Sequence, residues 1–173
     1  MEKVNIRING FAYAVDKGKT ILEAARDAGI VIPTLCYLKD LNAIGACRIC
    51  VVEVKGQRSL VASCVYPVSE GMEIVTNNER VLDARRMTLE LILSTHNRNC
   101  LSCVRSGNCE LQQLANDFGI EDAGRFDGEN IENLFDDSAV HMYRDNSKCI
   151  VCRRCTAMCG KSQEVAVIGA NDR

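Results

Sequence analysis

The chain has 173 residues, of which 47% are hydrophobic, and a formal net charge of −2. This length suits one or two compact domains, and the charge does not indicate nucleic acid or an anionic membrane surface as a partner. No apolar run approaches the ~20 residues that cross a bilayer, and the N-terminus lacks the apolar core of a secretory signal, so we expect a cytoplasmic location.

The chain begins with a predicted hairpin. Polar and apolar residues alternate over 3–8, which is typical of a strand with one buried face. Asn9-Gly10 is a strong two-residue turn signal, and residues 11–15 form the return strand.

A helix follows the hairpin, with Thr20 and Glu23 as a capping box and Gly29 as its end. Further strands are expected at residues 51–54, 59–62 and 72–76. Together these elements predict a first domain at residues 1–77, a β-grasp-like sheet with one helix across it.

Residues 78–120 predict a small helical domain. Thr76 and Glu79 form a second capping box before a long helix that ends at His96, and a shorter helix ends at Gly119. The fold class is therefore α+β.

An acidic connector is expected at residues 121–144. Residues 117–137 hold eight acidic side chains and one arginine, so we expect exposure, with disorder possible and a short turn near Asn133 to Phe135. The last segment, residues 145–173, carries the final cysteines.

Eleven cysteines are far above ordinary usage, and the sequence shows no export signal. In a reducing compartment such cysteines indicate metal ligands, whereas a disulfide framework would leave one thiol over. They divide without remainder into groups of four, three and four.

The first group predicts a [2Fe–2S] site, because one C-x-x-C pair and two outlying cysteines supply two thiolates to each iron. The small residues Gly45 and Ala46 let backbone N–H groups approach the sulfides, and such hydrogen bonds raise a cluster's potential. Structural zinc is the alternative, although zinc sites usually pair two C-x-x-C motifs. The predicted ligands are Cys36, Cys47, Cys50 and Cys64.

The second group predicts a [4Fe–4S] site at the end of the long helix. Its H-x3-C-x2-C-x5-C spacing wraps a loop around a cubane, and a neutral imidazole makes the cluster less negative. The alternative for the histidine is a favourable interaction with the helix C-terminus. His141 has no cysteines nearby and is expected to be solvated. The predicted ligands are His96, Cys100, Cys103 and Cys109.

The third group is a C-x2-C-x2-C-x3-C run. In two-cluster ferredoxins the first three such cysteines bind one cubane and the fourth reaches the other. A helix that starts near Cys155 would carry Cys159 about one turn away from the first cubane. We therefore expect Cys149, Cys152 and Cys155 to bind one [4Fe–4S] cluster, and Cys159 a second whose other ligands are absent.

Two alternatives remain open at this third group. In the second interpretation, Cys159 folds back and completes a single, self-sufficient cluster site. The neighbouring basic residues offset cluster charge or are simply solvated, and we favour solvation; they are Lys148, Arg153 and Arg154. No phosphate loop, nucleophile elbow or acid/base pair is present, so we predict no catalytic residues.

With these ligand groups in this order, the chain resembles the N-terminal iron–sulfur region of the [FeFe] hydrogenase large subunit. The likeness is closest to the NADH- and ferredoxin-linked, electron-bifurcating hydrogenases of anaerobic bacteria. The segments that carry it are IPTLCYL, GACRICVVEV, RRMTLELILSTHNRNCLSC and KCIVCRRCTAMCGKSQEVAVIGA. The complex I large subunit and NAD-linked formate dehydrogenases share the first two ligand groups.

The resemblance implies a [2Fe–2S] domain, a His/Cys3 [4Fe–4S] domain and the start of a two-cluster ferredoxin-like domain. It also implies three partners: a flavoprotein NADH-dehydrogenase-like subunit, a small thioredoxin-like [2Fe–2S] subunit, and ferredoxin. The family's next C-x2-C-x2-C group and its H-cluster cysteines have no counterpart here. We therefore expect an electron relay of a hydrogenase, with a formate dehydrogenase or complex I relative as the alternative and a zinc-stabilised binding module as the third.

Overall fold

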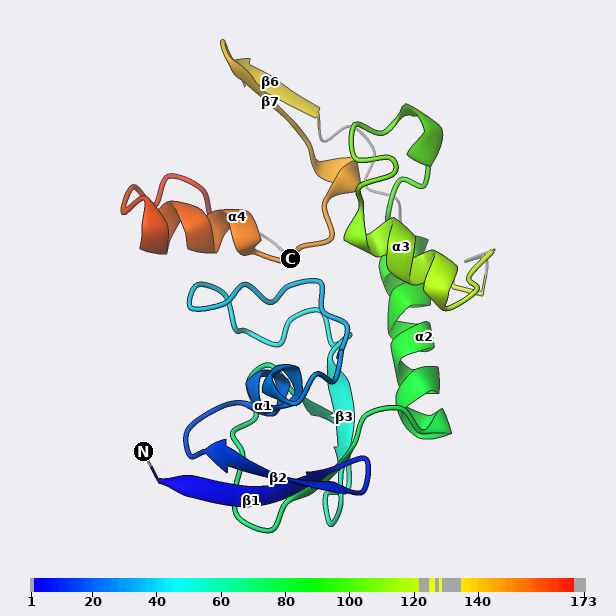
Figure 1. Ribbon diagram of the computed structural model, residues 1–173. Coiled ribbons are helices and arrows are strands. Elements are labelled where there is room, and N and C mark those ends of the chain that lie inside the picture. Colours follow the sequence, from blue (N-terminus) through cyan, green and yellow to red (C-terminus); the bar gives the residue numbers. More distant parts are fainter. Residues whose placement is uncertain (1, 122–124, 127, 129–134, 170–173) are drawn as a thin grey trace. The chain divides into compact units, whose positions relative to one another are not determined.

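The computed structural model describes residues 2–121, 125–126, 128 and 135–169. The chain forms two compact units, of which the first comprises Met1–Arg85 and Cys152–Arg173 and the second comprises Arg86–Val151. Figure 1 shows the elements of both units coloured along the sequence.

A five-stranded sheet forms the centre of the first unit. Its order is β2-β1-β5-β3-β4, with β1 and β5 parallel and the other neighbours antiparallel. This mixed α and β structure is consistent with the expected [2Fe–2S] ferredoxin-like domain. The strands are β1 (Lys3–Ile8), β2 (Phe11–Asp16), β3 (Val51–Val54), β4 (Val61–Ala62) and β5 (Glu73–Val75).

The first hairpin forms as predicted. Every second residue of β1 is buried, and Asn9 and Gly10 connect the two strands with positive φ angles of 51° and 88°. Both turn residues tolerate the left-handed conformation that a tight hairpin turn requires.

Helix α1 (Ile21–Asp27) also begins as predicted. The Thr20 side chain accepts a hydrogen bond from the Glu23 N–H, and the Glu23 carboxylate accepts one from the Thr20 N–H at 2.8 Å. Ile21 and Leu22 are fully buried in the hydrophobic core, which also contains the cysteines Cys50 and Cys64.

The predicted capping box before helix α2 (Glu79–Ser94) is wrong. The side chain of Asn78, rather than Thr76, accepts a hydrogen bond from a helix N–H, that of Val81 at 3.0 Å. Thr76 is instead buried and exchanges hydrogen bonds with Asn9, which lies far away in sequence. The tertiary contact with the hairpin turn therefore overrides the local pattern.

The second unit contains helix α3 and a hairpin that the sequence analysis did not expect. Strands β6 and β7 occupy the part of the chain that we interpreted as connector, and they pair antiparallel. The turn expected near Asn133 lies partly outside the described residues. The elements of this unit after α2 are η1 (Cys100–Ser102), α3 (Glu110–Asp117), β6 (Phe135–Ala139), β7 (Met142–Asp145) and η2 (Asn146–Lys148).

Arg125, in the described part of the same connector, makes a specific contact. Its guanidinium lies 3.4 Å from the buried carboxylate of Glu90 on α2, which Arg86 also contacts at 3.2 Å. Two cations thus compensate one buried carboxylate. The expectation of a merely exposed connector is incomplete, because this arginine pairs with the helix.

Candidate metal centres

The first cysteine group lies inside the sheet unit, and we call it the sheet site. Three of its members lie in the loop between α1 and β3, and the fourth follows β4. All four side chains are buried, with exposed fractions of 9% or less. The members are Cys36, Cys47, Cys50 and Cys64.

The thiols of the sheet site contact one another. Hydrogen bonds from Cys47 and Cys64 lower the pKa of the Cys36 thiol, and a hydrogen bond from Cys64 lowers the pKa of Cys50. The same hydrogen bonds raise the pKa of Cys47 and of Cys64, which donate them. The sequence-predicted set of four is therefore brought together by the fold.

Backbone N–H groups also point at these sulfurs. The N–H groups of Cys47 and Ala46 bond to the Cys36 sulfur and lower its pKa, behind the hydrogen bonds from the thiols. Gly45 and Arg48 place the loop by adopting φ angles of 63° and 56°. Backbone amides of this loop therefore bond to the Cys36 sulfur, and such amides stabilise anionic sulfur.

The sheet site fits a [2Fe–2S] cluster by the chemistry of its donors. Four buried thiols and inward-pointing amides suit an anionic cluster that takes two thiolates on each iron. Among the described residues, no three His, Cys, Asp or Glu side chains are grouped around one point as the ligands of a single ion are. A two-iron cluster needs no such point, because its four thiolates are divided between two irons.

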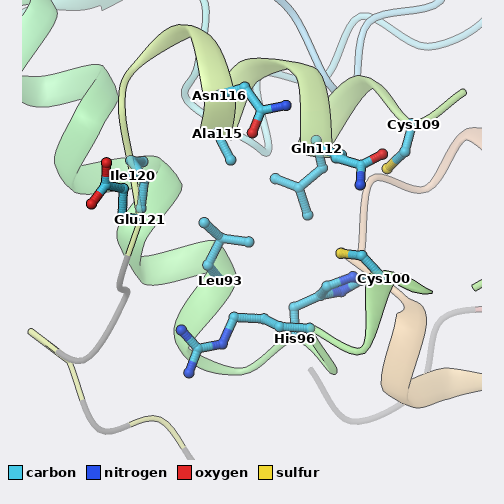
Figure 2. Close-up of a pocket in the computed structure, with 11 residues that line it drawn as sticks. Leu93, His96, Cys100, Cys109, Gln112, Ala115, Asn116, Ile120 and Glu121 are labelled. Atoms are coloured by element: carbon cyan, nitrogen blue, oxygen red, sulfur yellow. The ribbon is translucent and has the colours of Figure 1, made fainter. Parts of the chain in front are cut away.

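The second group, which we call the loop site, borders a cavity of about 230 Å³ in the second unit. Figure 2 shows the His96 ring and the sulfurs of Cys100 and Cys109 at the same end of this cavity. Cys103, at the end of η1, is half-buried and is not among the lining residues. The four members are His96, Cys100, Cys103 and Cys109.

His96 lies beyond the last residue of α2, and its Nδ1 is buried with no hydrogen-bond partner among the described residues. Burial lowers the pKa of His96, with Lys148 acting in the same direction and Asp145 in the opposite one. Burial therefore favours the neutral imidazole, which is the form that binds metals. An interaction with the helix C-terminus depends on the charged form instead.

The third group, the C-terminal cysteines, is divided between the two units. Cys149 belongs to the second unit and is exposed, whereas Cys152, Cys155 and Cys159 belong to the first. A helix begins near Cys155, as expected, since α4 covers Arg154–Ala157 and continues into η3 (Met158–Ser162).

Backbone strain accompanies these cysteines. Val151 and Arg153, on either side of Cys152, have φ angles of 55° and 59°. The left-handed region is unusual for any side chain and costly for a β-branched one such as Val151. The loop between the cysteines is thus held in a conformation that the chain would not adopt by local preference.

The segment 152–162 docks on the loop of the sheet site within the first unit. The buried Asn42 side chain donates hydrogen bonds to the Cys36 carbonyl at 2.7 Å and to the Cys152 carbonyl at 3.0 Å. Arg154 donates to the Tyr37 carbonyl at 3.1 Å, and Lys161 donates to the Leu41 carbonyl at 2.8 Å.

The interpretation of the basic residues as solvated is wrong for two of them. Arg154 takes part in this docking, and Lys148 donates to the carbonyls of Asn97 and Asn99 next to the loop site. His141 is exposed, as expected.

Sequence reasoning did not assign Asn42 or Arg85 a role near the sheet site. Arg85 is 4% exposed and donates a hydrogen bond to the Val51 carbonyl at 2.7 Å. The one available signal was the position of Arg85 within the apolar stripe of a helix. For Asn42 no local signal exists, because one of its partners lies 110 residues away.

Comparison with known families gives two adjacent matches. Residues 1–79 match a 2Fe-2S iron–sulfur cluster binding domain, and residues 85–123 match the NADH-ubiquinone oxidoreductase-G iron–sulfur binding region. The chain therefore binds [2Fe–2S] and [4Fe–4S] clusters.

Three curated relatives resemble the chain over most of its length. It is 45% identical to NADP-reducing hydrogenase subunit HndD of Solidesulfovibrio fructosivorans, over 100% of this chain and 30% of the relative. The NAD-reducing hydrogenase HoxS subunit gamma of Cupriavidus necator is 33% identical over 88% of this chain and 64% of the relative. The NADH-ubiquinone oxidoreductase 75 kDa subunit of Reclinomonas americana is 37% identical over 98% and 24%.

A solved structure is also similar. A chain of an NAD+-reducing [NiFe]-hydrogenase in the H2-reduced state is 33% identical, with a TM-score of 0.87 over 98% of this chain and 71% of that one. The chain spans less than two thirds of each of the three curated relatives. No helix in the described part of the chain is long and apolar enough to cross a membrane.

Proposed function

We propose that this chain, which belongs to the family of iron–sulfur subunits found in NAD(P)-reducing hydrogenases and NADH-ubiquinone oxidoreductase, is an electron relay with three cluster-binding groups. When bound, the clusters carry single electrons. The residues of the chain hold the clusters, shield them from water and set their potentials.

The observation that carries this proposal is the sheet site. Its four thiols are buried, contact one another and receive backbone hydrogen bonds, all within one folded unit. We therefore assign the [2Fe–2S] cluster to these four cysteines. Burial and amide hydrogen bonds on sulfur are the features by which a protein tunes such a cluster for electron transfer.

We assign a [4Fe–4S] cluster to the loop site. The Nδ1 of His96 is buried and has no hydrogen-bond partner in the part of the chain that the structure describes. This supports a role as a ligand, because such a polar atom is costly and metal binding would satisfy it. Cys103 completes the set by its spacing in the sequence.

We assign a second [4Fe–4S] cluster to Cys149, Cys152 and Cys155. We assign Cys159 to a further cluster, whose other ligands are not among these 173 residues. The short helix that contains Cys155 supports this division, because it and the following turn carry the fourth thiolate onward by about one turn. The proposed domains are 1–77, 78–120, a connector at 121–144, and 145–173.

For the whole enzyme we propose an electron-bifurcating [FeFe] hydrogenase of the cytoplasm. Its relay would connect a flavoprotein NADH subunit, a thioredoxin-like [2Fe–2S] subunit and ferredoxin with a hydrogen-activating site outside these residues. The identity of 45% to a NADP-reducing hydrogenase subunit over the full chain supports this proposal. A relay of a complex I relative is the second candidate, supported by 37% identity to a 75 kDa subunit.

The proposal is tested on the native complex, purified anaerobically from its source and frozen within milliseconds of mixing with NADH. We expect EPR signals of a reduced [2Fe–2S] centre and of reduced [4Fe–4S] centres to appear together. A chain whose signals never respond to NADH or to any complex partner would contradict the relay function.

Hydrogen gas separates the two candidates. In a hydrogenase, H2 alone reduces the clusters of the oxidised complex, whereas in a complex I relative only NADH does. Clusters that remain oxidised under H2 while NADH reduces them would overturn the hydrogenase proposal and favour the second candidate.

A further inference from the structure

Arg85 is a buried cation beside the sheet site. It lies on the apolar stripe of α2, between Val81 and Leu89, which are both fully buried. Its Nη2 donates a hydrogen bond to the carbonyl of Val51, the residue that follows Cys50, at 2.7 Å. Its Nε is buried and has no hydrogen-bond partner among the described residues. One N–H group of the guanidinium thus donates a hydrogen bond, and the Nε–H group has no acceptor among the described residues.

The charge of Arg85 has no carboxylate partner within the described residues, unlike the charges of two neighbours on the same helix. Arg80 pairs with Glu53 at 2.8 Å, and Arg86 pairs with Glu90 at 3.2 Å. Burial lowers the pKa of Arg85 to about 10, and the negative charge that opposes this effect is that of Cys50. The hydrogen bond to Val51, the residue after Cys50, places the guanidinium against the chain segment that carries this thiol of the sheet site.

A buried cation without a counter-ion is strongly unfavourable. A [2Fe–2S] cluster with four thiolates is an anion, and its net charge is one of the quantities that set its potential. A cation buried at the same site is little screened by water or salt. The charge of the buried Arg85 cation and the charge of the anionic cluster therefore compensate each other.

We propose that Arg85 is a positioning residue of the [2Fe–2S] site, which acts through Cys50 as the buried counter-ion of the cluster and raises its reduction potential. This inference rests on the proposed role of Cys50 as a ligand. Reduction adds one electron, and so one negative charge, and breaks no bond. Arg85 stabilises that added charge more than it stabilises the oxidised state, because attraction grows with charge.

The test uses the full chain with its clusters reconstituted anaerobically. The potential of the [2Fe–2S] centre is read from its EPR signal during a titration with dithionite. Three variants separate charge from shape: Arg85→Lys keeps the charge, Arg85→Gln keeps a donor for the Val51 carbonyl without the charge, and Arg85→Met removes both. Arg86→Gln, whose parent side chain is half-exposed and paired with Glu90, is the matched control.

We expect the potential to shift to more negative values in Arg85→Gln and Arg85→Met, and to stay near that of the parent chain in Arg85→Lys and Arg86→Gln. Equal potentials in the parent chain and Arg85→Gln would overturn the proposal. So would a shift in Arg85→Lys as large as that in Arg85→Met, since the effect would then follow shape rather than charge.

Two further outcomes are distinguishable. If Arg85→Met does not fold, the comparison of Arg85→Gln with Arg85→Lys decides alone, and loss of the cluster in both would overturn a charge role. If Cys50→Ser retains the parent [2Fe–2S] signal and potential, the ligand assignment fails, whatever the Arg85 variants show.

Discussion

The sheet site and the loop site hold their ligands in different ways. The sheet site has four buried cysteines, two of which belong to the hydrophobic core of the first unit. The loop site has three half-buried cysteines and one half-buried histidine on the connections between helices of the second unit, and His96, Cys100 and Cys109 border a cavity. One site is part of a core, and the other borders an open space.

This difference indicates which interactions fix the arrangement of the ligands in each site. In the sheet site, the thiols contact one another within the packed core of the first unit. In the loop site, the fold places the ligands near one another, and the binding energy of the cluster must supply the remaining order. Five experiments test this contrast.

The largest effect is expected from replacing Cys47 and Cys50 together by serine. The rhombic EPR signal of the reduced [2Fe–2S] centre should vanish completely, because the cluster loses two of its four thiolate ligands. The [4Fe–4S] signals of the same sample should remain, which controls for global unfolding. A retained [2Fe–2S] signal would contradict the assignment of the sheet site.

The next effect concerns the core that supports the sheet site. Ile74 lies on β5 and is 1% exposed, so Ile74→Ala should lower the free energy of unfolding of the first unit by about 2–5 kcal/mol. Denaturant unfolding measures this value. Phe11→Ala, at a side chain that is 69% exposed, is the control and should cost less than about 1 kcal/mol. Equal effects would deny that sheet packing organises the site.

Removal of all clusters should separate the two sites directly. In the cluster-free chain, amides of β1 and β3 should exchange with solvent at least ~100-fold more slowly than those of residues 96–109, a difference of about 3 kcal/mol in local stability. Hydrogen exchange followed by mass spectrometry measures this ratio. Uniform protection in both regions would show that the loop site is also ordered by the fold alone.

A smaller effect is expected at the contact between the sheet site and the segment that carries Cys152. Asn42→Leu removes two hydrogen bonds and leaves the buried carbonyl of Cys36 and the partly buried carbonyl of Cys152 without this donor, which should cost about 1–3 kcal/mol. We expect faster hydrogen exchange in residues 152–162, with the [2Fe–2S] signal retained. Unchanged exchange would mean that Arg154 and Lys161 suffice for docking.

The mildest change is His96→Cys. It should preserve the [4Fe–4S] cluster of the loop site, because a thiolate replaces one ligand by another, and lower its potential by adding negative charge. An EPR-monitored redox titration measures the shift. If the potential and the spectrum stay unchanged, His96 does not bind iron and the helix-terminus interpretation stands.

Local features of the sequence determined the elements that begin and end within a few residues. Alternation over Lys3–Ile8, the Asn9-Gly10 turn and the Thr20/Glu23 capping box each involve neighbours in the chain, so their geometry follows from short-range sterics and hydrogen bonds. The cysteine spacing likewise predicted the two cluster types that the family matches show.

The tertiary structure decided the contacts between residues that are far apart in the chain. Thr76 has the local pattern of a helix cap, yet Asn9 binds it and Asn78 caps the helix. Asn42 and Arg85 acquire their roles only when the chain brings them to Cys36 and Val51. Such contacts depend on how distant segments pack, and packing energies are not encoded in the spacing of neighbouring residues.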